Sequence, residues 1–428
     1  MSANEKAVAL EDRARSRNEV GRLDRWLRRR VLGRFAQLKH GELLIEDDLG
    51  QVRLGGAADL SGRVKVHDMR FWRLLATGGG LGAAEAYMAG LWDSPDLVAV
   101  IRVLARNRDA LAAIDQGGAR ISGLLMKLWH AFNRNSLAGS RRNIAAHYDL
   151  GNDFFAAWLD QRMMYSSALF GQPEDSLETA QVAKLDRICA KLGLGPEHHL
   201  LEIGTGWGGL AIHAAQTSGC RVTTTTISRE QYDHARALVR ELGLEDRVEI
   251  LLKDYRDLDG QYDRVVSVEM IEAVGHQYLD VYLAQIERRL KPDGLALIQA
   301  ITIEDFRYAS ALGSVDYIKR YIFPGSFIPS VSAITAAMAR STRLGLIELA
   351  DFGASYGLTL KAWRERFESS WDRIAQIGFD ETFRRRWRYY LAYCEGGFME
   401  RAISDVHLLL AAPGFRPACV SGLTAGRP

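Results

Sequence analysis

The sequence predicts an α/β protein built on a seven-stranded, Rossmann-like sheet, with a small α+β domain before it. From residue 176 onward, short apolar runs alternate with helical segments, a pattern typical of parallel strands joined by crossover helices. A glycine-rich loop follows the first of these runs directly. An insertion of about 40 residues separates the fifth and sixth runs, and insertions of this kind often build a substrate site.

The strands are predicted from short apolar runs rich in β-branched residues. Helical segments separate the first five runs, so we expect those five strands to be parallel. The predicted strands are HLLEI (199–203), RVTTTTI (221–227), RVEILL (247–252), DRVVSV (263–268), LALIQAITI (295–303), LGLIELADF (344–352) and VHLLLAA (406–412). The insertion lies between LALIQAITI (295–303) and LGLIELADF (344–352) and contains VDYIKRYIFPGSFIPSVSAI.

A different pattern precedes this region. The runs ELLIED, QVRLGG and GRVKVHD read as short strands, and the helical stretch after them is interrupted at Gly78–Gly80. The expected divisions are a disordered segment (1–20), an accessory domain (21–125), a linker (126–145), a main domain (146–415) and a tail (416–428).

Composition excludes several classes of protein. The chain has 428 residues, of which 47% are apolar and 25% charged, as in ordinary globular proteins. Its 55 basic and 53 acidic residues argue against wholesale nucleic-acid binding. The four cysteines form no C-x-x-C pair, so we expect no disulfide framework, no metal site and a reducing cytoplasm. No apolar signal region or membrane-spanning run is present, and we expect a cytoplasmic protein.

A basic amphipathic helix is predicted in GRLDRWLRRRVLGRFAQL, near the start of the accessory domain. Its apolar residues recur at helical spacing, and six arginines surround them. Two interpretations stay open. The helix lies on anionic lipid, or it packs on its own domain.

The loop in LLEIGTGWGGLAIHAA is a candidate cofactor site. Gly204 and Gly206 stand between a strand and a helix, where glycines let a ligand approach the backbone. Gly204, Gly206 and Gly209 have the spacing of the dinucleotide fingerprint G-x-G-x-x-G, so the loop alone does not separate a dinucleotide from an adenosyl ligand. Glu202, two places before the first glycine, favours S-adenosylmethionine, a ligand without a pyrophosphate.

Further cofactor contacts are expected where the next two strands end. RVTTTTI lacks the usual acidic residue for ribose hydroxyls, and Thr226 and Gln231 are the available substitutes. Gln231 also completes an S-x-x-Q capping box, so its amide alternatively closes a helix start. Asp254 and Tyr255 follow the third strand, in reach of an adenine edge and face.

Two glutamates follow the fourth strand, in VVSVEMIEAVGH. Glu269 and Glu272 are three residues apart and would share one face of a short helix. A functional carboxylate is one interpretation, and a solvated helix start is the other.

Six motifs in fixed order carry a family resemblance. They are HYDLGNDFFAAWLDQRMMYSSALF, LLEIGTGWGG, DYRDL, VSVEMIEAVGH, KRYIFPGSFIPS and RYYLAYCEGGF. Together they resemble the cyclopropane-fatty-acyl-phospholipid synthases and the related mycolic-acid cyclopropane synthases, over about residues 126–412. The resemblance implies a class I methyltransferase sheet with a lipid-binding insertion and an N-terminal accessory domain.

The resemblance also implies a reaction. The family transfers a methyl group from S-adenosylmethionine to a cis double bond in an unsaturated acyl chain of a membrane phospholipid, and proton loss then closes a cyclopropane ring. The expected partners are that chain, the inner surface of the membrane and a second copy in a homodimer. The alternative is a fatty-acyl C-methyltransferase that makes a methyl or methylene branch without a ring.

The residues implied by the resemblance fall into two groups. In the family a bicarbonate ion acts as the base, which here implies Glu272, Tyr321, Gln299 and the backbone at Ser167 and Ile301. Gln299 stands where the family often has histidine; an amide can donate a hydrogen bond but cannot carry a proton, which is why ring closure is not assured. The remaining implied residues are Tyr165 and Ser166 beside the cofactor and Cys394, whose surroundings favour a buried structural thiol.

Overall fold

The computed structural model describes residues 21–56, 59–108 and 150–416. The predicted disordered segment (1–20), the linker (126–145) and nearly all of the tail (416–428) lie outside these residues. The chain divides into two compact units. The first comprises 1–129, 314–321 and 378–400, and the second comprises 130–313, 322–377 and 401–428.

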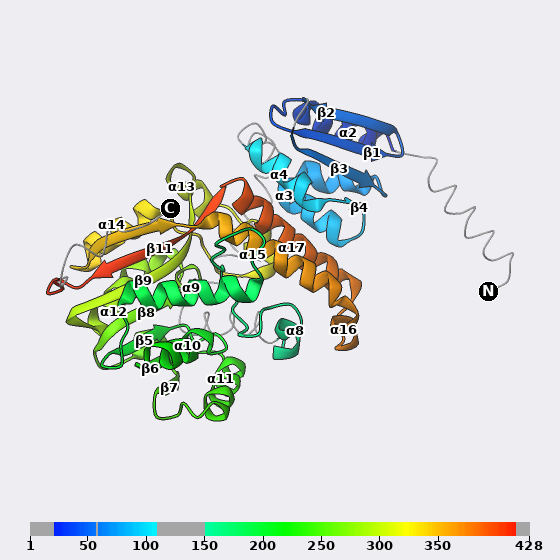
Figure 1. The fold of residues 1–428 in the computed structure, drawn as a ribbon. Coiled ribbons are helices and arrows are strands. Elements are labelled where there is room, and N and C mark those ends of the chain that lie inside the picture. Colours follow the sequence, from blue (N-terminus) through cyan, green and yellow to red (C-terminus); the bar gives the residue numbers. More distant parts are fainter. Residues whose placement is uncertain (1–20, 57–58, 109–149, 417–428) are drawn as a thin grey trace. The chain divides into compact units, whose positions relative to one another are not determined.

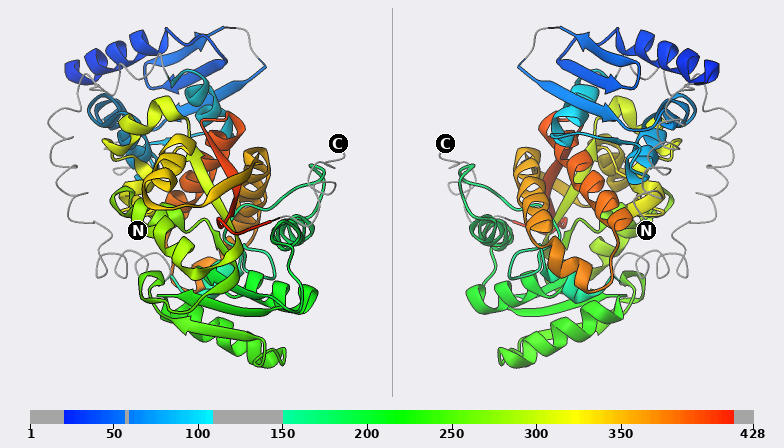
Figure 2. Two further views of the ribbon diagram at one scale, coloured as in Figure 1. Left: turned by 90° about the vertical axis from the view of Figure 1, so that its left-hand side faces the viewer. Right: turned by 90° about the vertical axis from the view of Figure 1, so that its right-hand side faces the viewer.

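The first unit contains the small sheet expected of the accessory domain (Figures 1 and 2). Its strand order is β2-β1-β3-β4, with β1 and β3 parallel and the other pairs antiparallel. The strands are β1 (Glu42–Asp47), β2 (Gly50–Gly55), β3 (Ser61–Val66) and β4 (Trp92–Asp93), and the helices are α2 (Arg22–Phe35), α3 (Arg70–Met88), α4 (Leu97–Arg106) and α17 (Glu381–Met399). The predicted interruption is confirmed, because Gly79 leaves the helical conformation with a φ of 54°.

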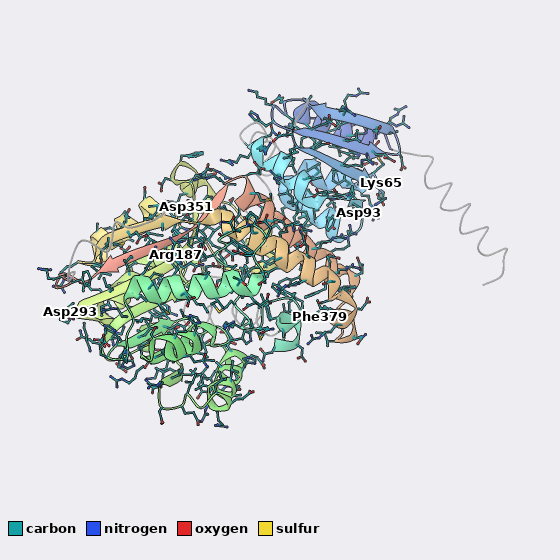
Figure 3. The ribbon with its side chains drawn as sticks, viewed as in Figure 1. Lys65, Asp93, Arg187, Asp293, Asp351 and Phe379 are labelled. Atoms are coloured by element: carbon teal, nitrogen blue, oxygen red, sulfur yellow. The ribbon has the colours of Figure 1, made fainter. Side chains whose placement is uncertain are left out.

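Helix α17 joins this unit although it is almost 300 residues away in sequence. It packs against α3 and α4. Arg385 donates to Asp93, which is labelled in Figure 3, over 2.8 Å. Glu400, just past the helix, accepts from both Arg102 and Arg106 over 2.6 Å. Because these charge-assisted bonds are partly shielded from water, they hold α17 more firmly than exposed ion pairs would.

The second unit contains the seven-stranded sheet predicted from the sequence, in the order β10-β11-β9-β8-β5-β6-β7 (Figure 1). The strands are β5 (His199–Ile203), β6 (Arg221–Thr226), β7 (Val248–Leu252), β8 (Tyr262–Val268), β9 (Leu290–Ile303), β10 (Gly345–Asp351) and β11 (Ile403–Ala411). β5 to β9 pair in parallel, whereas β11 is antiparallel to both β9 and β10. The sheet is therefore mixed.

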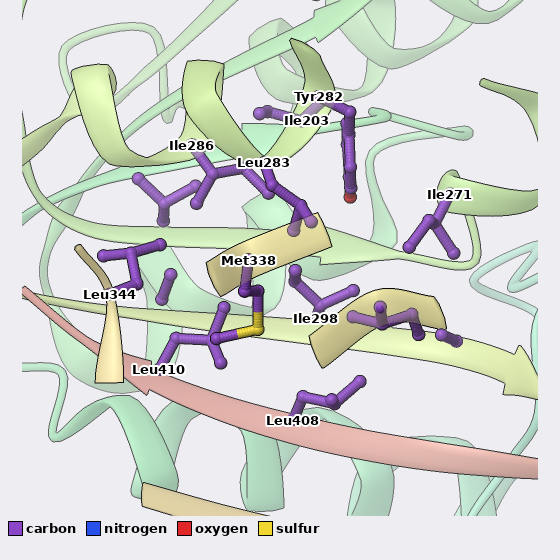
Figure 4. Close-up of a cluster of buried hydrophobic side chains, with 14 of the residues drawn as sticks. Ile203, Ile271, Tyr282, Leu283, Ile286, Ile298, Met338, Leu344, Leu408 and Leu410 are labelled. Atoms are coloured by element: carbon purple, nitrogen blue, oxygen red, sulfur yellow. The ribbon is translucent and has the colours of Figure 1, made fainter. Parts of the chain in front are cut away.

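Helices cover both faces of this sheet. One core cluster joins the sheet to α9 (Leu177–Leu192), α10 (Gly209–Ser218) and α11 (Arg229–Glu241). The other joins it to α12 (Leu279–Arg289) and α14 (Val331–Ser341), and the Met338 side chain of α14 lies beside Ile298 and Leu410 of the sheet (Figure 4). The remaining helices are α8 (Asn152–Ala156), α13 (Asp305–Leu312), α15 (Gly353–Ser369) and α16 (Trp371–Gln376).

The strand order places a switch point between β5 and β8. The chain runs outward from β5 through β6 to β7 and then returns to add β8 on the other side of β5. Ligands of open α/β sheets bind beyond the carboxyl ends of the strands at such a point. The two segments that leave β5 and β8 there are the glycine-rich loop and the stretch that carries Glu269 and Glu272.

Candidate active site

The glycine-rich loop has the tight geometry expected of a cofactor loop. Gly204 leaves β5 with a φ of 106°, which a residue with a side chain adopts only under strain. A Cβ on Gly209, at the start of α10, would lie 2.4 Å from the sulfur of Met164. The loop therefore needs glycine for its backbone conformation at one end and for close packing at the other.

Glu202 is buried at the carboxyl end of β5. Its Oε2 accepts a 2.6 Å hydrogen bond from the Thr224 hydroxyl on the neighbouring strand β6. Burial raises the pKa of Glu202 to about 8. A bound cation would reverse that shift, so the side chain fits the predicted role towards an ammonium or ribose group.

Thr226 and Gln231 contact each other after β6. The Thr226 hydroxyl donates to the Gln231 side-chain oxygen over 2.9 Å, and the Ser228 hydroxyl accepts from the Gln231 backbone. Only this half of the capping box forms, because the Ser228 backbone N–H donates to the Thr226 hydroxyl oxygen instead of to the side-chain oxygen of Gln231. The side-chain oxygen of Gln231 thus accepts from Thr226 and does not close the helix start.

Asp254 and Tyr255 follow β7 as predicted, with Asp254 capping the short helix η1 (Tyr255–Asp257). The carboxylate of Asp254 is paired with the Arg256 side chain. Its two oxygens accept from Arg256 Nε and Nη2 over 2.8 and 2.7 Å. The Tyr255 ring packs edge-on against Tyr282, and burial raises its pKa to about 12. Asp254 is therefore half of an ion pair, and its carboxylate is already engaged by Arg256.

Tyr165 and Ser166 lie where α9 and α15 approach the sheet. The Tyr165 ring packs against Trp158 and Trp363, with centroids 5.6 and 5.4 Å away. The Ser166 hydroxyl accepts a 2.8 Å hydrogen bond from Lys184 on α9. Tyr165 thus belongs to an aromatic cluster, and Ser166 connects the same segment to a buried ammonium group.

Glu269 follows β8 and lies at the centre of a hydrogen-bond network. Its Oε1 accepts from the Ser167 backbone over 2.8 Å and from the Gln299 amide over 2.7 Å. Its Oε2 accepts from the Tyr356 hydroxyl over 2.7 Å. The backbone φ of Glu269 is 47°, in the left-handed region. The sequence predicted no particular role for this residue, and Tyr356 was missed.

Gln299 connects the hydrogen-bond network of Glu269 to two further buried polar residues, Asp405 and His407. Its amide nitrogen also donates to Asp405 over 2.8 Å, and its oxygen is 3.1 Å from His407 Nε2. Because the Gln299 oxygen can only accept, His407 donates here. Burial lowers the pKa of His407 to about 2, which keeps the ring neutral. Asp405 and His407 were also missed, although a polar pair inside the apolar run of β11 is a usable signal.

Glu272 lies on η2 (Ile271–Ala273) with its neighbour Ile271 anchored in the core (Figure 4). Its Oε1 accepts a 2.6 Å hydrogen bond from the Ile301 backbone. Among the described residues, its buried Oε2 has no hydrogen-bond partner. Burial, with the charge of Glu269 adding to it, raises the pKa of Glu272 to about 8. Glu272 is therefore mainly protonated near pH 7.

Lys184 is the cation of this region and was not predicted. Its side chain is fully buried, and burial lowers its pKa to about 8. The nearby carboxylates of Glu269, Asp160 and Asp405 oppose that shift. Lysines are rarely buried without a charge partner, so its position inside the carboxylate group marks this region as unusual.

Two of the predicted site residues, Tyr321 and Cys394, belong to the first unit. The Tyr321 hydroxyl donates to Glu85 over 2.7 Å. Burial raises the pKa of the Cys394 thiol, which favours the neutral form. This agrees with the interpretation of Cys394 as a structural thiol rather than a nucleophile.

The donors expected to bind bicarbonate are engaged by side chains of the protein. The Ser167 backbone and the Gln299 amide donate to Glu269, and the Ile301 backbone donates to Glu272. A free anion would have to displace carboxylates from all three donors and would add a negative charge beside them. The residues present therefore do not fit a bound bicarbonate.

Comparisons with known proteins agree with the fold and identify the family. The family model described as mycolic acid cyclopropane synthetase matches residues 135–408. The chain is 44% identical over 334 residues to a tuberculostearic acid methyltransferase of Mycobacterium tuberculosis, covering 76% of this chain and 77% of that protein. It is 39% identical over 356 residues to the cyclopropane-fatty-acyl-phospholipid synthase of Escherichia coli, covering 82% and 88%.

Solved structures of the same kind are also similar. The cyclopropane synthase MmaA2 of Mycobacterium tuberculosis superposes with a TM-score of 0.59 at 28% identity, over 63% of this chain and 98% of that one. The mycolic acid cyclopropane synthase CmaA1, solved with SAH and CTAB, gives the same values.

Proposed function

Because the chain belongs to the mycolic acid cyclopropane synthetase family and is an S-adenosylmethionine-dependent fatty-acyl methyltransferase, we propose that it methylates the cis double bond of unsaturated acyl chains in membrane phospholipids. One observation carries this proposal. The glycine loop and the carboxylate network leave neighbouring strands at the switch point, and a Cβ on Gly204 would lie 3.4 Å from Met270, between the two glutamates. The two glutamates are thus beside the cofactor loop.

The residues after β5, β6 and β7 fit the cofactor. Glu202 would face the ammonium or ribose group, Thr226 and Gln231 the ribose hydroxyls, and Tyr255 the adenine face. When bound, S-adenosylmethionine supplies an electrophilic methyl group. The protein must hold the alkene in line with that methyl group and exclude water, because an alkene is a weak nucleophile.

We propose a methylene-branched product as the first candidate and the cyclopropane expected from the sequence as the second. Methyl transfer to an alkene leaves a secondary cation. Immediate proton loss from the new methyl group closes a ring, whereas a prior 1,2-hydride shift gives a tertiary cation and then a methylene branch. Burial raises the pKa of Glu269, and its three hydrogen bonds oppose that rise. They therefore make the carboxylate less basic than burial alone would and lengthen the life of the cation. The 44% identity to a tuberculostearic acid methyltransferase also favours the branch.

We further propose that helix α2 binds the membrane surface. Val31 and Phe35 are buried in the first unit, so part of the apolar stripe packs on its own domain. The other part stays exposed, with Leu23 55% and Trp26 50% accessible. Arg22, Arg25, Arg29 and Arg30 are exposed around them. Exposed apolar side chains within a ring of cations match an anionic lipid surface. Among the described residues, no helix is long and apolar enough to span a bilayer.

Product identification tests the proposal. The protein and S-adenosylmethionine are incubated with vesicles of a defined cis-monounsaturated phosphatidylglycerol, and the released fatty acids are analysed by gas chromatography with mass spectrometry. The expected product gains one CH2 and elutes as a methylene branch. A cyclopropane product would replace the first candidate with the second. Absence of any mass gain would refute acyl methylation of phospholipids.

A further inference from the structure

We propose that Glu269 is the general base of this enzyme, and that its carboxylate replaces a free anion in taking the proton from the transferred methyl group. The inference rests on the proposed function and deepens it, because it names the group that removes the proton. It starts from the observation that Glu269 receives the hydrogen bonds expected for a bicarbonate ion.

The carboxylate of Glu269 has an oxygen available for the proton. Oε1 accepts two hydrogen bonds, from Ser167 and Gln299, and Oε2 accepts one, from Tyr356. Each carboxylate oxygen offers two lone-pair directions, so Oε2 keeps one. Gln299 and Asp405 are completely buried, whereas Glu269 is only partly buried. Of these three side chains, Glu269 is the one that a substrate can reach.

The backbone at Glu269 is held in a costly conformation. Its φ of 47° lies in the left-handed region, which is unusual and unfavourable for a residue other than glycine. Its own N–H donates to the Gln299 carbonyl over 2.9 Å, and its side chain makes three more bonds. Strain of this kind persists where the surroundings enforce it, and it is concentrated at functional sites.

The charges separate the two glutamates. Two neighbouring carboxyl groups do not ionise equally, and the better-solvated one keeps the charge. Glu269 has three donors and the Lys184 ammonium group, whereas Glu272 has one donor and a buried oxygen without a partner among the described residues. Burial raises the pKa of both carboxyl groups, but the three donors and the Lys184 ammonium group oppose that rise at Glu269. We therefore assign the proton to Glu272 and the charge to Glu269, which can then act as a base.

The proton transfer is balanced within the site. A C–H bond of the transferred methyl group breaks, and its electron pair forms the new carbon–carbon bond of the methylene group or ring. The proton passes to Oε2 of Glu269. It leaves to water after the product departs, which restores the carboxylate. Gln299 positions Glu269 through its amide, and no step requires it to carry a proton.

Substitution of the two glutamates provides the first test. Glu269→Gln removes the base with little change in size, and turnover is expected to fall by about 10²- to 10⁴-fold. Binding of S-adenosylhomocysteine, measured by calorimetry, should stay close to that of the wild type. Glu272→Gln should lose less activity than Glu269→Gln, because the amide resembles the protonated acid. Glu245→Gln on the surface is the control. A larger loss for Glu272→Gln would overturn the proposal.

Anion dependence provides the second test. Turnover of the wild type should be unchanged when bicarbonate is removed from the assay by degassing under nitrogen. Glu269→Gly suits the left-handed backbone and releases the Ser167, Gln299 and Tyr356 donors. Added bicarbonate or formate should restore part of its activity in a saturable way.

The outcomes separate the two proposals. A wild type that loses activity without bicarbonate and recovers it on addition would overturn Glu269 as the base and leave the proposed function intact. An equal loss of S-adenosylhomocysteine binding in Glu269→Gln would also overturn it, since the residue would then be structural. Absence of methylated lipid with and without bicarbonate would refute the proposed function itself.

Discussion

Charge is arranged in opposite ways on helix α2 and at the end of strand β8. On α2, Arg22, Arg25, Arg29 and Arg30 are exposed, and the Arg30 guanidinium lies 4.9 Å from the centre of the Trp26 ring. After β8, Glu269 and Lys184 lie in a region where burial shifts the pKa of both. Exposed charges are screened and act over a surface, whereas buried charges are few and strongly coupled. The first arrangement suits docking, and the second suits proton transfer.

The largest effect is expected from removing the buried cation. Lys184→Met leaves Glu269 and Asp405 without their ammonium group, so the free energy of unfolding should fall by about 3 kcal/mol, measured by urea denaturation. The pKa of Glu269 should rise, since Lys184 acts to lower it, and the acid limb of the pH–rate profile should move to higher pH.

A lysine on the same helix gives the matched control. Lys191 bonds to Glu348 over 2.7 Å at a partly exposed position. Lys191→Met should therefore cost no more than about 1 kcal/mol. An equal fall in unfolding free energy for the two variants would show that the buried Lys184 contributes no more to stability than the partly exposed Lys191.

A smaller effect is expected in the pH dependence of stability. The folded-state pKa of Glu272 is raised to about 8, so the folded protein holds a proton that the unfolded chain releases near its ordinary value. This contribution to stability is complete below that ordinary value and is lost as the pH rises towards 8. Glu272→Gln should flatten the decline in unfolding free energy between about pH 5 and 8. An unchanged slope would show that Glu272 is ionised in the folded protein.

The smallest effect is expected on the surface of α2. Arg25→Gln should weaken binding to vesicles of phosphatidylglycerol by about 1 kcal/mol, measured by co-sedimentation. Binding should also fall as the salt concentration rises. Leu49→Ala, an exposed apolar position in the same unit, is the control. Binding that ignores both charge and salt would exclude α2 as the lipid-binding surface.

The strands could be predicted because their signal is local. All seven predicted runs became strands of the main sheet, with ends that differ by a few residues; the largest difference is at β9, which begins at Leu290 rather than 295. The turn at Gly204 and the break at Gly79 were also confirmed, because glycine marks backbone conformations that other residues avoid. The grouping of α17 with the first unit has no such local signal.

The carboxylate network could be predicted only in part. The sequence drew attention to Glu269, Glu272 and Gln299, but assigned the anion site to Glu272. The partners that distinguish the two glutamates are remote in sequence: Ser167 is 102 residues before Glu269, and Tyr356 is 87 residues after it. Lys184 occupies an ordinary position in a helical pattern, and nothing adjacent to it in sequence indicates burial.

By itself, the sequence determined the α/β class, the seven strands, the cofactor loop and the family, because periodicity, turn residues and motif order are properties of neighbouring residues. Only the tertiary structure decided which glutamate receives three hydrogen bonds and a buried ammonium group and which is left with one. The reason is that protonation depends on solvation and nearby charge, and folding brings those together from distant parts of the chain.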